Sequence, residues 1–320
     1  MTLSVVIPVL NEENNVPELA RRLRETLDDA GIPFEVVFVN DGSTDQTPQI
    51  LQELHDQDKR IKAVHLARNF GHQAAISAGL VAACGGAVVI MDGDMQDSPE
   101  MLLRFVEKWR EGFDVVYAIR ERRSESWLKT QGYKMFYRLL GQISQITMPL
   151  DTGDFSLMSR RVVDVLNAMP ERTRFVRGMR SWVGFRQVGV GHIRGPRYAG
   201  EPKYTYAKLF RLALDGFFAF SYRPLQLASL FGLIVSILAL LLAAGLIVLK
   251  LTHGIPLLGW TSLIVAVLFM GGVQLICVGI LGEYVGRIYE ETRGRPPYIV
   301  ARVTGDVRLI QDASEGPGER

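Results

Sequence analysis

The chain has 320 residues, of which 48% are hydrophobic, and its formal net charge is only +2. This length allows one or two domains with a sizeable core. So small a charge says little about partners, and we expect no nucleic-acid partner. Its two cysteines fit a reducing compartment and argue against a disulfide framework. The first residues enter an apolar run at once, without the pattern of a signal peptide.

Short apolar runs alternate with segments of helical periodicity through the first 120 residues. The runs LSVVIPVL, FEVVFVN, IKAVHLA and AVVIMD predict strands, and the stretch from Val16 to Leu27 places apolar residues on one helical face. A second helix is expected to start at Thr47 and Pro48. This alternation predicts an α/β fold with a Rossmann-like, mostly parallel sheet that helices cover on both faces.

Polar segments follow all four predicted strands and read NEE, NDGSTD, RNFGHQ and DGDMQD in chain order. Ligands of such sheets bind at the carboxyl ends of the strands. The four segments therefore predict one acidic, hydrogen-bonding site at a single rim. Neither a G-x-G-x-x-G nor a G-x-x-x-x-G-K-[ST] motif is present, so a phosphate ligand would need another counter-charge.

The last of these segments holds two carboxylates one residue apart, Asp92 and Asp94. They can turn toward a common point where Mg²⁺ or Mn²⁺ would bind together with substrate phosphates. A calcium loop of EF-hand type is disfavoured because the sixth position holds Asp97 instead of glycine. A plain acidic turn accounts for Asp97 alone, with Ser98 as the N-cap and Pro99 as the first residue of the next helix.

Two long apolar runs follow, because no ionisable side chain appears from Pro224 to Leu249 or from Gly254 to Gly282. Each exceeds the roughly 20 residues that a transmembrane helix needs. They predict a hairpin of transmembrane helices at about 225–249 and 255–282, the alternative being two buried helices of a soluble core. The outer ends carry more basic residues than the connecting turn, so both termini are expected in the cytoplasm. These residues are Arg211, Arg223, Arg287, Arg293 and Arg295, against Lys250.

The segment 201–224, just before the first run, mixes apolar side chains such as Phe217 and Phe218 with Lys208 and Arg211. This pattern predicts an amphipathic helix at the membrane surface. A core helix against the sheet is the alternative.

Several segments resemble the family 2 glycosyltransferases with the GT-A fold in order and spacing. They are VVIPVLNEENNV, VNDGSTDQT, ARNFGHQAAISAGL and MDGDMQDSPE. Three later segments, DTGDFSLMSR, RFVRGMRSWVGF and LGEYVGRIYEETRGRPPYIV, are similar to the polyprenyl-phosphate glycosyltransferases. This branch includes bactoprenol glucosyltransferases and dolichol-phosphate mannosyltransferases. The resemblance covers the chain to about Val300.

The resemblance implies a role for each matching residue. Pro8 and Glu12 would line the nucleotide pocket, Asp41 would contact the base, Arg68 and Gly71 would pack around the donor, and Gln96 would lie beside the diphosphate. Asp92 and Asp94 would hold Mg²⁺ or Mn²⁺, whose charge stabilises the departing diphosphate. Arg120, Arg123, Arg138 and Arg177 would hold the acceptor phosphate, since guanidinium groups match phosphate oxygens. Exposed surface charges are the alternative for these arginines.

Asp154 falls where the family often places a catalytic base, so Asp154 and Asp94 are the predicted catalytic residues. A phosphate monoester has its second pKa near ~6, so the acceptor is mostly a dianion in the cytoplasm and needs little help in losing a proton. Asp154 therefore acts either as a base or as a group that orients the acceptor.

The sequence thus predicts a catalytic domain at 1–200, the surface segment at 201–224, two transmembrane helices within 225–282 and a cytoplasmic tail at 283–320. The expected reaction transfers one glucose from UDP-glucose to undecaprenyl phosphate with inversion. It takes place at the cytoplasmic face of the bacterial inner membrane and serves modification of lipopolysaccharide or another cell-envelope glycan.

Three alternatives stay open. The first is a mannosyl or aminoarabinose donor with a polyprenyl or dolichyl phosphate acceptor. The second, a processive polysaccharide synthase, is disfavoured because the chain has no Q-x-x-R-W motif and two spans are too few for a channel. The third is a membrane-anchored nucleotide-sugar binder without catalysis. A homo-oligomer is also left open by the sequence.

Overall fold

The computed structural model describes residues 2–120, 152–172, 174–192, 223–253 and 259–307. The chain forms two compact units. One carries a sheet and its covering helices and includes the segment that starts at Arg295. The other carries two long helices.

The first unit is built on an eight-stranded sheet with the order β7-β5-β6-β4-β1-β2-β3-β8. Strands β4, β1, β2 and β3 are parallel neighbours, and β5 is parallel to β7, whereas β6 and β8 run antiparallel to their neighbours. The predicted α/β fold with a mostly parallel sheet is therefore confirmed. The strands are β1 (Leu3–Val9), β2 (Phe34–Asn40), β3 (Ile61–Leu66), β4 (Ala87–Ile90), β5 (Val115–Arg120), β6 (Thr152–Ser159), β7 (Gln187–His192) and β8 (Val300–Thr304).

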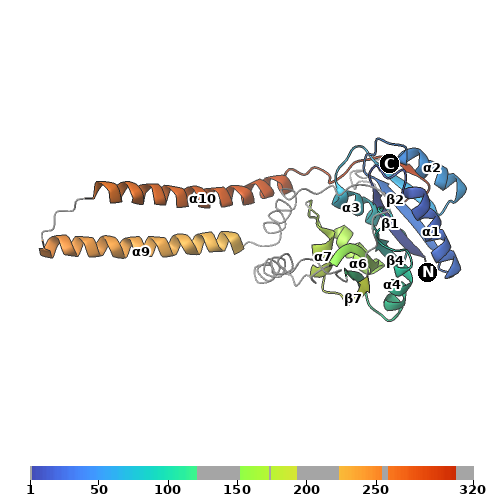
Figure 1. The fold of residues 1–320 in the computed structure, drawn as a ribbon, viewed down its shortest axis with the longest axis horizontal. Helices are drawn as coiled ribbons and strands as arrows, with labels where there is room; N and C mark the ends of the chain where they lie inside the picture. The colour runs from blue at the N-terminus through green and yellow to red at the C-terminus, as the bar shows by residue number, and fades with distance from the viewer. Residues whose placement is uncertain (1, 121–151, 173, 193–222, 254–258, 308–320) are drawn as a thin grey trace, which may run out of the picture. The chain divides into compact units, whose positions relative to one another are not determined.

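Helices cover both faces of this sheet, as Figure 1 shows. One core contains Val5 and Ile7 of β1, and the other contains Val6, because successive side chains of a strand point to opposite faces. Full burial of such a side chain contributes about 2 kcal/mol. The first core is closed by α1 (Val16–Asp29), α2 (Thr47–Gln57) and α4 (Met101–Arg110), and the second by α3 (His72–Ala82), α6 (Arg160–Ala168) and α7 (Val176–Trp182).

The start of α4 differs from the prediction that Ser98 caps it. The amide of Met101 donates to the carbonyl of Ser98 at 3.1 Å, and the amide of Leu102 donates to that of Pro99 at 3.0 Å. These bonds span three residues, so residues 98–101 form a tight turn and the helix begins at Met101, with Glu100 as its N-cap. The assignment of Ser98 and Pro99 to the first turn of the helix is wrong.

The second unit consists of α9 (Arg223–His253) and α10 (Trp260–Thr292), which run alongside each other in Figure 1. Most described side chains on both helices are exposed, including large apolar ones such as Leu240 and Leu275. Among the described residues, the segment Leu263–Thr292 is long and apolar enough to cross a membrane, and its most apolar stretch of 18 residues has a mean hydropathy of 2.6. Ala228–Leu242 is a shorter apolar helix. Of the predicted surface segment, 201–222 lie outside the described residues.

Strand β8 corrects the expectation that residues 283–320 form only a tail. It pairs with β3 in the antiparallel sense, and just before it the amide of Ala67 donates to the carbonyl of Ile299 at 2.9 Å. The buried ring of His65 on β3 lies 3.3 Å from the hydroxyl of Thr304 on β8. The apolar pattern of this short strand was hidden in the sequence by the basic and proline-rich residues before it.

Candidate active site

The loops after β1 and β2 are joined by reciprocal hydrogen bonds. The amide of Asn11 donates to the hydroxyl of Ser43 at 2.9 Å, while the Asn11 side-chain oxygen accepts from the amide of Thr44 at 2.8 Å. Glu12 donates its amide to the hydroxyl of Thr47 at 3.0 Å. These bonds hold the two loops together at the carboxyl edge of the sheet. Asn11 adopts a left-handed conformation, with φ of 53°, which asparagine tolerates better than most residues.

The turn after β2 is also fixed to the loop after β3. Both carboxylate oxygens of Asp41 accept backbone bonds, from Phe70 at 2.7 Å and from Gly71 at 3.0 Å. Gly42 has φ of +72°, and a β-carbon there would lie 2.5 Å from backbone atoms of Arg68 and Asn69. Burial raises the pKa of Asp41, and the two backbone donors oppose that rise. Asp41 therefore acts in this structure as the anchor of the RNFGHQ loop.

The turn after β4 carries Asp92 and Asp94 against the end of β1. A β-carbon on Gly93 would lie 3.0 Å from the side chain of Val9 and 3.2 Å from the carbonyl oxygen of Pro8, so a larger residue would push the turn away. The Asp94 carboxylate accepts the amide of Gln96 at 3.1 Å. The sequence thus places the two carboxylates on a tight turn whose backbone is fixed from both sides.

Asp97 has a different role from the one expected. Its carboxylate is buried and lies 3.2 Å from Nε2 of His192, the last residue of β7, which is equally buried. The ring of His192 also meets the edge of Phe155, with 5.7 Å between centroids. Asp97 therefore ties the end of the β4 turn to β7 and does not serve mainly to start α4.

Strand β6 brings Asp154 to the same rim. Because β6 runs antiparallel to β4, with Ile90 opposite Ser156, continuing the register two residues further places Asp154 opposite Asp92. His72, the first residue of α3, lies between them, and its Nε2 is 3.6 Å from an oxygen of each carboxylate. Residues from three separate elements thus converge on one place.

One carboxylate oxygen of Asp154 is surrounded by donors. Nε2 of Gln73 lies 3.3 Å from Oδ2, and Nη2 of Arg177 lies 3.4 Å from the same atom. Gln73 is itself fixed, because its side-chain oxygen accepts the amide of Val176 at 2.9 Å. Burial would raise the pKa of Asp154, but the hydrogen bond from His72 and the charge of Arg177 outweigh it and hold that pKa well below its usual range. Asp154 is therefore ionised at neutral pH.

The pKa of Asp92 shifts in the opposite direction. Burial and the negative charges of Asp97, Asp154 and Asp94 raise its pKa, although nearby His72 partly opposes this effect. For His72, burial disfavours the charged ring, but Asp154 and Asp92 outweigh burial and raise its pKa. The rim thus concentrates negative charge around Asp92.

Such a concentration of carboxylates fits a divalent cation. Within the described part of the chain, no group of three or more His, Cys, Asp or Glu side chains is arranged to hold a metal alone. Asp92 and Asp94 supply two hard oxygen ligands, and Mg²⁺ typically takes one or two carboxylates and completes its shell with substrate phosphates and water. The donor set therefore fits an ion that binds together with a diphosphate.

The other predicted site residues divide into three groups. Pro8 is buried in β1, and Glu12 lies in the loop after it, where its carboxylate accepts from the Asn15 side chain at 2.5 Å. Arg68 is exposed and stacks on the ring of Phe70, with 4.2 Å to the centroid. Arg120 ends β5, but its side chain lies outside what the structure describes, as do Arg123 and Arg138.

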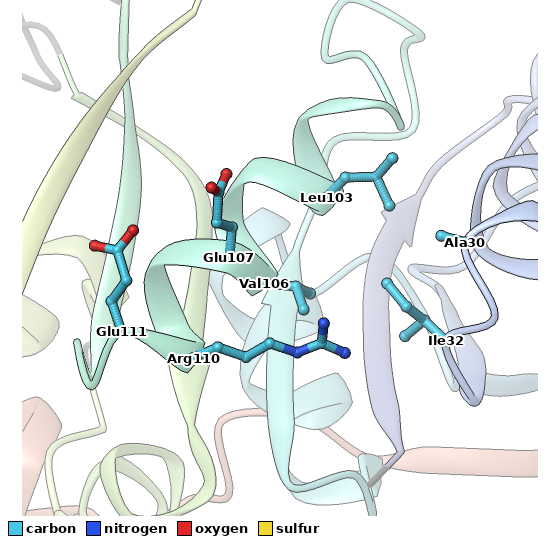
Figure 2. Close-up of a pocket in the computed structure, with 7 residues that line it drawn as sticks. All are labelled: Ala30, Ile32, Leu103, Val106, Glu107, Arg110 and Glu111. Carbon is cyan, nitrogen blue, oxygen red and sulfur yellow. The ribbon is translucent and has the colours of Figure 1, made fainter.

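A separate surface groove of about 500 Å³ lies at the opposite edge of the sheet. Ile32, two residues before the start of β2, faces Val106 and Arg110 of α4 across this groove (Figure 2). The amino ends of the parallel strands meet here, whereas the acidic groups gather at their carboxyl ends. The groove is therefore not part of the candidate site.

Sequence reasoning missed His72, Gln73 and the pair formed by Asp97 and His192. His72 and Gln73 stand in the quoted RNFGHQ segment, so their place at a strand end was a usable signal. The partner of Asp97 lies 95 positions away. No local pattern connects such residues before the strand order is known.

Comparison with known proteins agrees with this architecture. Residues 4–166 match the model of the family described as glycosyl transferase family 2. An uncharacterized glycosyltransferase of Synechocystis sp. is 47% identical over 95% of this chain and 96% of that protein. A prophage-derived bactoprenol glucosyl transferase of Shigella flexneri is 42% identical over 94% of this chain and 98% of that protein.

Among solved structures, the mannosyltransferase PcManGT of Pyrobaculum calidifontis, in complex with GDP-Man and Mn²⁺, has a TM-score of 0.45 and 19% identity, covering 68% of this chain and 63% of that chain. The family resemblance noted in the sequence is confirmed by the family model and by the two relatives, which match over nearly their full length. This chain belongs to glycosyl transferase family 2 and is a glycosyltransferase.

Proposed function

We propose that this protein transfers a single glucose from UDP-glucose to the phosphate of undecaprenyl phosphate, with inversion, at the cytoplasmic face of a bacterial membrane. The observation that carries the proposal is the 42% identity to a bactoprenol glucosyl transferase over 94% of this chain. Such an identity extends beyond the family domain at residues 4–166 and includes the segment with the two long helices.

The donor would bind at the rim that contains the loops after β1, β2 and β4. Pro8, Glu12 and Asp41 would lie around the nucleotide, and Arg68, Gly71 and Gln96 around the sugar diphosphate. Asp92 and Asp94 would hold Mg²⁺ or Mn²⁺, which supplies positive charge to the departing diphosphate. The raised pKa of Asp92 supports this assignment, because a cation there would relieve the repulsion among the carboxylates.

Asp154 would orient reacting groups instead of accepting a proton. A carboxylate whose pKa is held well below its usual range is a weak base. The acceptor phosphate, with its second pKa near ~6, is already mostly a dianion and can attack without deprotonation. Asp154 would then fix Arg177 and His72 beside the metal-binding carboxylates, where Arg177 would face incoming phosphate oxygens.

Arg177 is the predicted acceptor-phosphate residue for which the structure describes a contact at the site. Its guanidinium lies beside Asp154 and is partly exposed, so one face stays open to a phosphate. Arg120, Arg123 and Arg138 would also bind the acceptor phosphate.

The acceptor lipid requires a membrane, and α9 and α10 would provide the attachment. We propose that they cross it as a hairpin, preceded by a surface segment at 201–224, with both termini in the cytoplasm. The mean hydropathy of 2.6 in the most apolar 18 residues of Leu263–Thr292 and the exposure of apolar side chains support this placement. The catalytic domain would then comprise 1–200 together with β8.

Reconstitution of the full-length protein tests the proposed reaction. The protein in vesicles is incubated with Mg²⁺, undecaprenyl phosphate and one of several labelled nucleotide sugars, and the label in the organic extract is counted. We expect labelled lipid from UDP-glucose alone, and loss of product when Asp154→Asn replaces the wild type. An Asp164→Asn variant, which changes an exposed carboxylate on α6, serves as the control.

Other results would reject the proposal in distinct ways. Product from a mannosyl or aminoarabinose donor, and none from UDP-glucose, would overturn the choice of sugar. Tight binding of UDP-glucose without any lipid product would favour the membrane-anchored binder.

A further inference from the structure

Arg180 on α7 is the largest fully buried side chain in the described part of the protein, and it has few partners. It is 1% exposed, and neither its Nε nor its Nη2 has a hydrogen-bond partner. Its guanidinium lies 5.4 Å from the centre of the Tyr117 ring. Burial lowers the pKa of Arg180 to about 10, so the side chain stays charged at neutral pH.

Stability does not account for an arginine at this position. A buried charge without hydrogen bonds is costly, and replacing such a group by an apolar side chain of similar volume is often neutral or stabilising. The Tyr117 ring that Arg180 covers packs against the apolar core of the same face. The fold could therefore accept a methionine at position 180.

Arg180 lies over the ring of Tyr117, which pairs with Ser156 on β6, two residues from Asp154. Electrostatic attraction to Asp154 favours the charged guanidinium, and the second carboxylate oxygen of Asp154, Oδ1, is also buried and without a hydrogen-bond partner. Its other oxygen receives His72, Gln73 and Arg177. Arg177 and Arg180 lie three residues apart on α7, which places them on the same side of the helix.

We propose that Arg180 is a positioning residue whose buried charge fixes the orientation of the Asp154 carboxylate, and through it the guanidinium of Arg177. This inference rests on the proposed glycosyl transfer, for which Arg177 meets the acceptor phosphate. With Arg180 in place, Asp154 is attracted from its buried side and keeps Oδ2 toward the rim. Without it, the carboxylate can rotate and Arg177 loses a fixed partner.

Arg180→Met tests this role, because methionine has a similar length and no charge. We expect a thermal unfolding midpoint equal to or above that of the wild type, a kcat about 100-fold lower, as for a misplacement of about 1 Å, and an unchanged KM for UDP-glucose. Arg180→Lys keeps the charge and should recover part of kcat.

Arg174→Met is the matched control. Arg174 is also largely buried, but its guanidinium donates to the carbonyl oxygens of Leu166 and Met169 and makes no contact with Asp154. We expect this variant to unfold at a lower temperature and to keep its kcat. If Arg180→Met behaves in the same way, or does not fold, Arg180 is a structural residue and the inference is overturned.

A double-mutant cycle in unfolding separates this inference from the proposed function, because it needs no turnover. Asp154→Asn should lower the unfolding midpoint of the wild type, since it leaves Arg180 buried without a counter-charge, and should lower that of Arg180→Met much less. If Asp154→Asn lowers the unfolding midpoint equally in the two backgrounds, the inference is contradicted even if glucosyl transfer is found. If Asp154 and Arg180 are coupled in unfolding but no glycolipid product forms, the proposed function is rejected and the interaction between the two residues is confirmed.

Discussion

The carboxylate of Asp92 lies close to other carboxylates whose charges raise its pKa. Its raised pKa reflects burial first and then the charges of Asp97, Asp154 and Asp94, against the opposing effect of His72. Removing its charge should therefore relieve repulsion in the metal-free protein while removing a proposed metal ligand.

We expect Asp92→Asn to unfold at the same or a higher temperature than the wild type without divalent ions, and to transfer sugar at least about 100-fold more slowly. Mg²⁺ together with UDP should raise the unfolding midpoint of the wild type, because a ligand that binds the folded state stabilises it, and should leave that of the variant unchanged. Thermal scans with and without both ligands measure these shifts.

Asp56→Asn is the control, since Asp56 is exposed and pairs only with neighbours on or next to α2. It should match the wild type in both assays. An Asp92→Asn protein that still gains stability from Mg²⁺ and UDP would show that the cation binds elsewhere.

At the level of single residues, the sequence predicted candidates better than partners. Asp92, Asp94 and Asp154 were found because strand ends and family motifs are local patterns, and the structure brings all three to one rim. Asp41 was expected to contact a nucleotide base, a contact that stays a prediction, but its bonds to the backbone amides of Phe70 and Gly71 were not foreseen. The chemistry of a side chain can be read from the sequence. Its hydrogen-bond partner cannot, because that depends on how distant loops pack together.

Among the loops, the contact between the β2 turn and the β3 loop depends on one glycine. Gly42 combines φ of +72° with a gap too small for a β-carbon, which would lie 2.5 Å from backbone atoms of Arg68 and Asn69. A substitution must therefore strain its own backbone and separate the two loops.

We expect Gly42→Ala to lower the free energy of unfolding by about 3 kcal/mol and to weaken UDP binding, because Asp41 then loses its hold on the RNFGHQ loop. Gly31→Ala is the control, since Gly31 has a similar φ of +62° with nothing within 4 Å of its would-be β-carbon. It should cost about 1 kcal/mol without a change in UDP affinity. Chemical denaturation and titration calorimetry measure both effects, and equal losses in the two variants would rule out the steric account.

Strand β8 is attached to β3 through a buried histidine. His65 is 4% exposed, and its Nδ1 lies 3.1 Å from the side-chain nitrogen of Asn40. On the other side its Nε2 faces Thr304, whose hydroxyl donates to the side-chain oxygen of Gln52. All of these hydrogen bonds can form when the ring is neutral and carries its proton on Nε2, because Asn40 can donate only to an unprotonated Nδ1.

This arrangement predicts how stability depends on pH. Burial first, and then the charge of Arg302, lower the pKa of His65 to about 4, compared with about 6.5 in the unfolded chain. Between these values only the unfolded state binds the proton, so the free energy of unfolding falls as the pH falls through this window. Above pH 6.5 the group has no further effect.

The comparison of the wild type with His65→Gln isolates this contribution from other titrating groups. The stability advantage of the wild type should shrink by about 2 kcal/mol between pH 7 and pH 4.5, as measured by chemical denaturation at the two pH values. A constant difference would mean that the ring titrates normally and that β8 is not held by a neutral His65.

Local patterns predicted the elements as far as β4 and failed where the connection became long range. The runs that became β1 to β4 are apolar and bounded by polar turns, so their alternation with helices was visible. The antiparallel β6 was missed because strand direction is not encoded in its residues. β8 was missed because it is separated from its partner β3 by more than 200 positions along the chain, as the contact between His65 and Thr304 shows.

For the whole molecule, the proposed hairpin predicts on which side of the membrane each part of the chain lies. Two spans joined by a short turn place both flanks of the hairpin on one side, and the arginines at those flanks favour the cytoplasm. The catalytic unit, with β8, should therefore be on the cytoplasmic side, whereas residues 254–258 should be on the other side.

The native cysteines allow this topology to be tested within one chain. Cys84 is exposed on the catalytic unit, and Cys277 lies within α10. In a Cys277→Ser background with Gly254→Cys, a membrane-impermeant maleimide added to intact spheroplasts should label position 254 but not Cys84. In inside-out vesicles the labelling should reverse, because the surface that faced the cytoplasm is then exposed to the reagent. Labelling of both cysteines in the same preparation of sealed vesicles would contradict a spanning hairpin, and would instead indicate that α9 and α10 lie on one surface of the membrane.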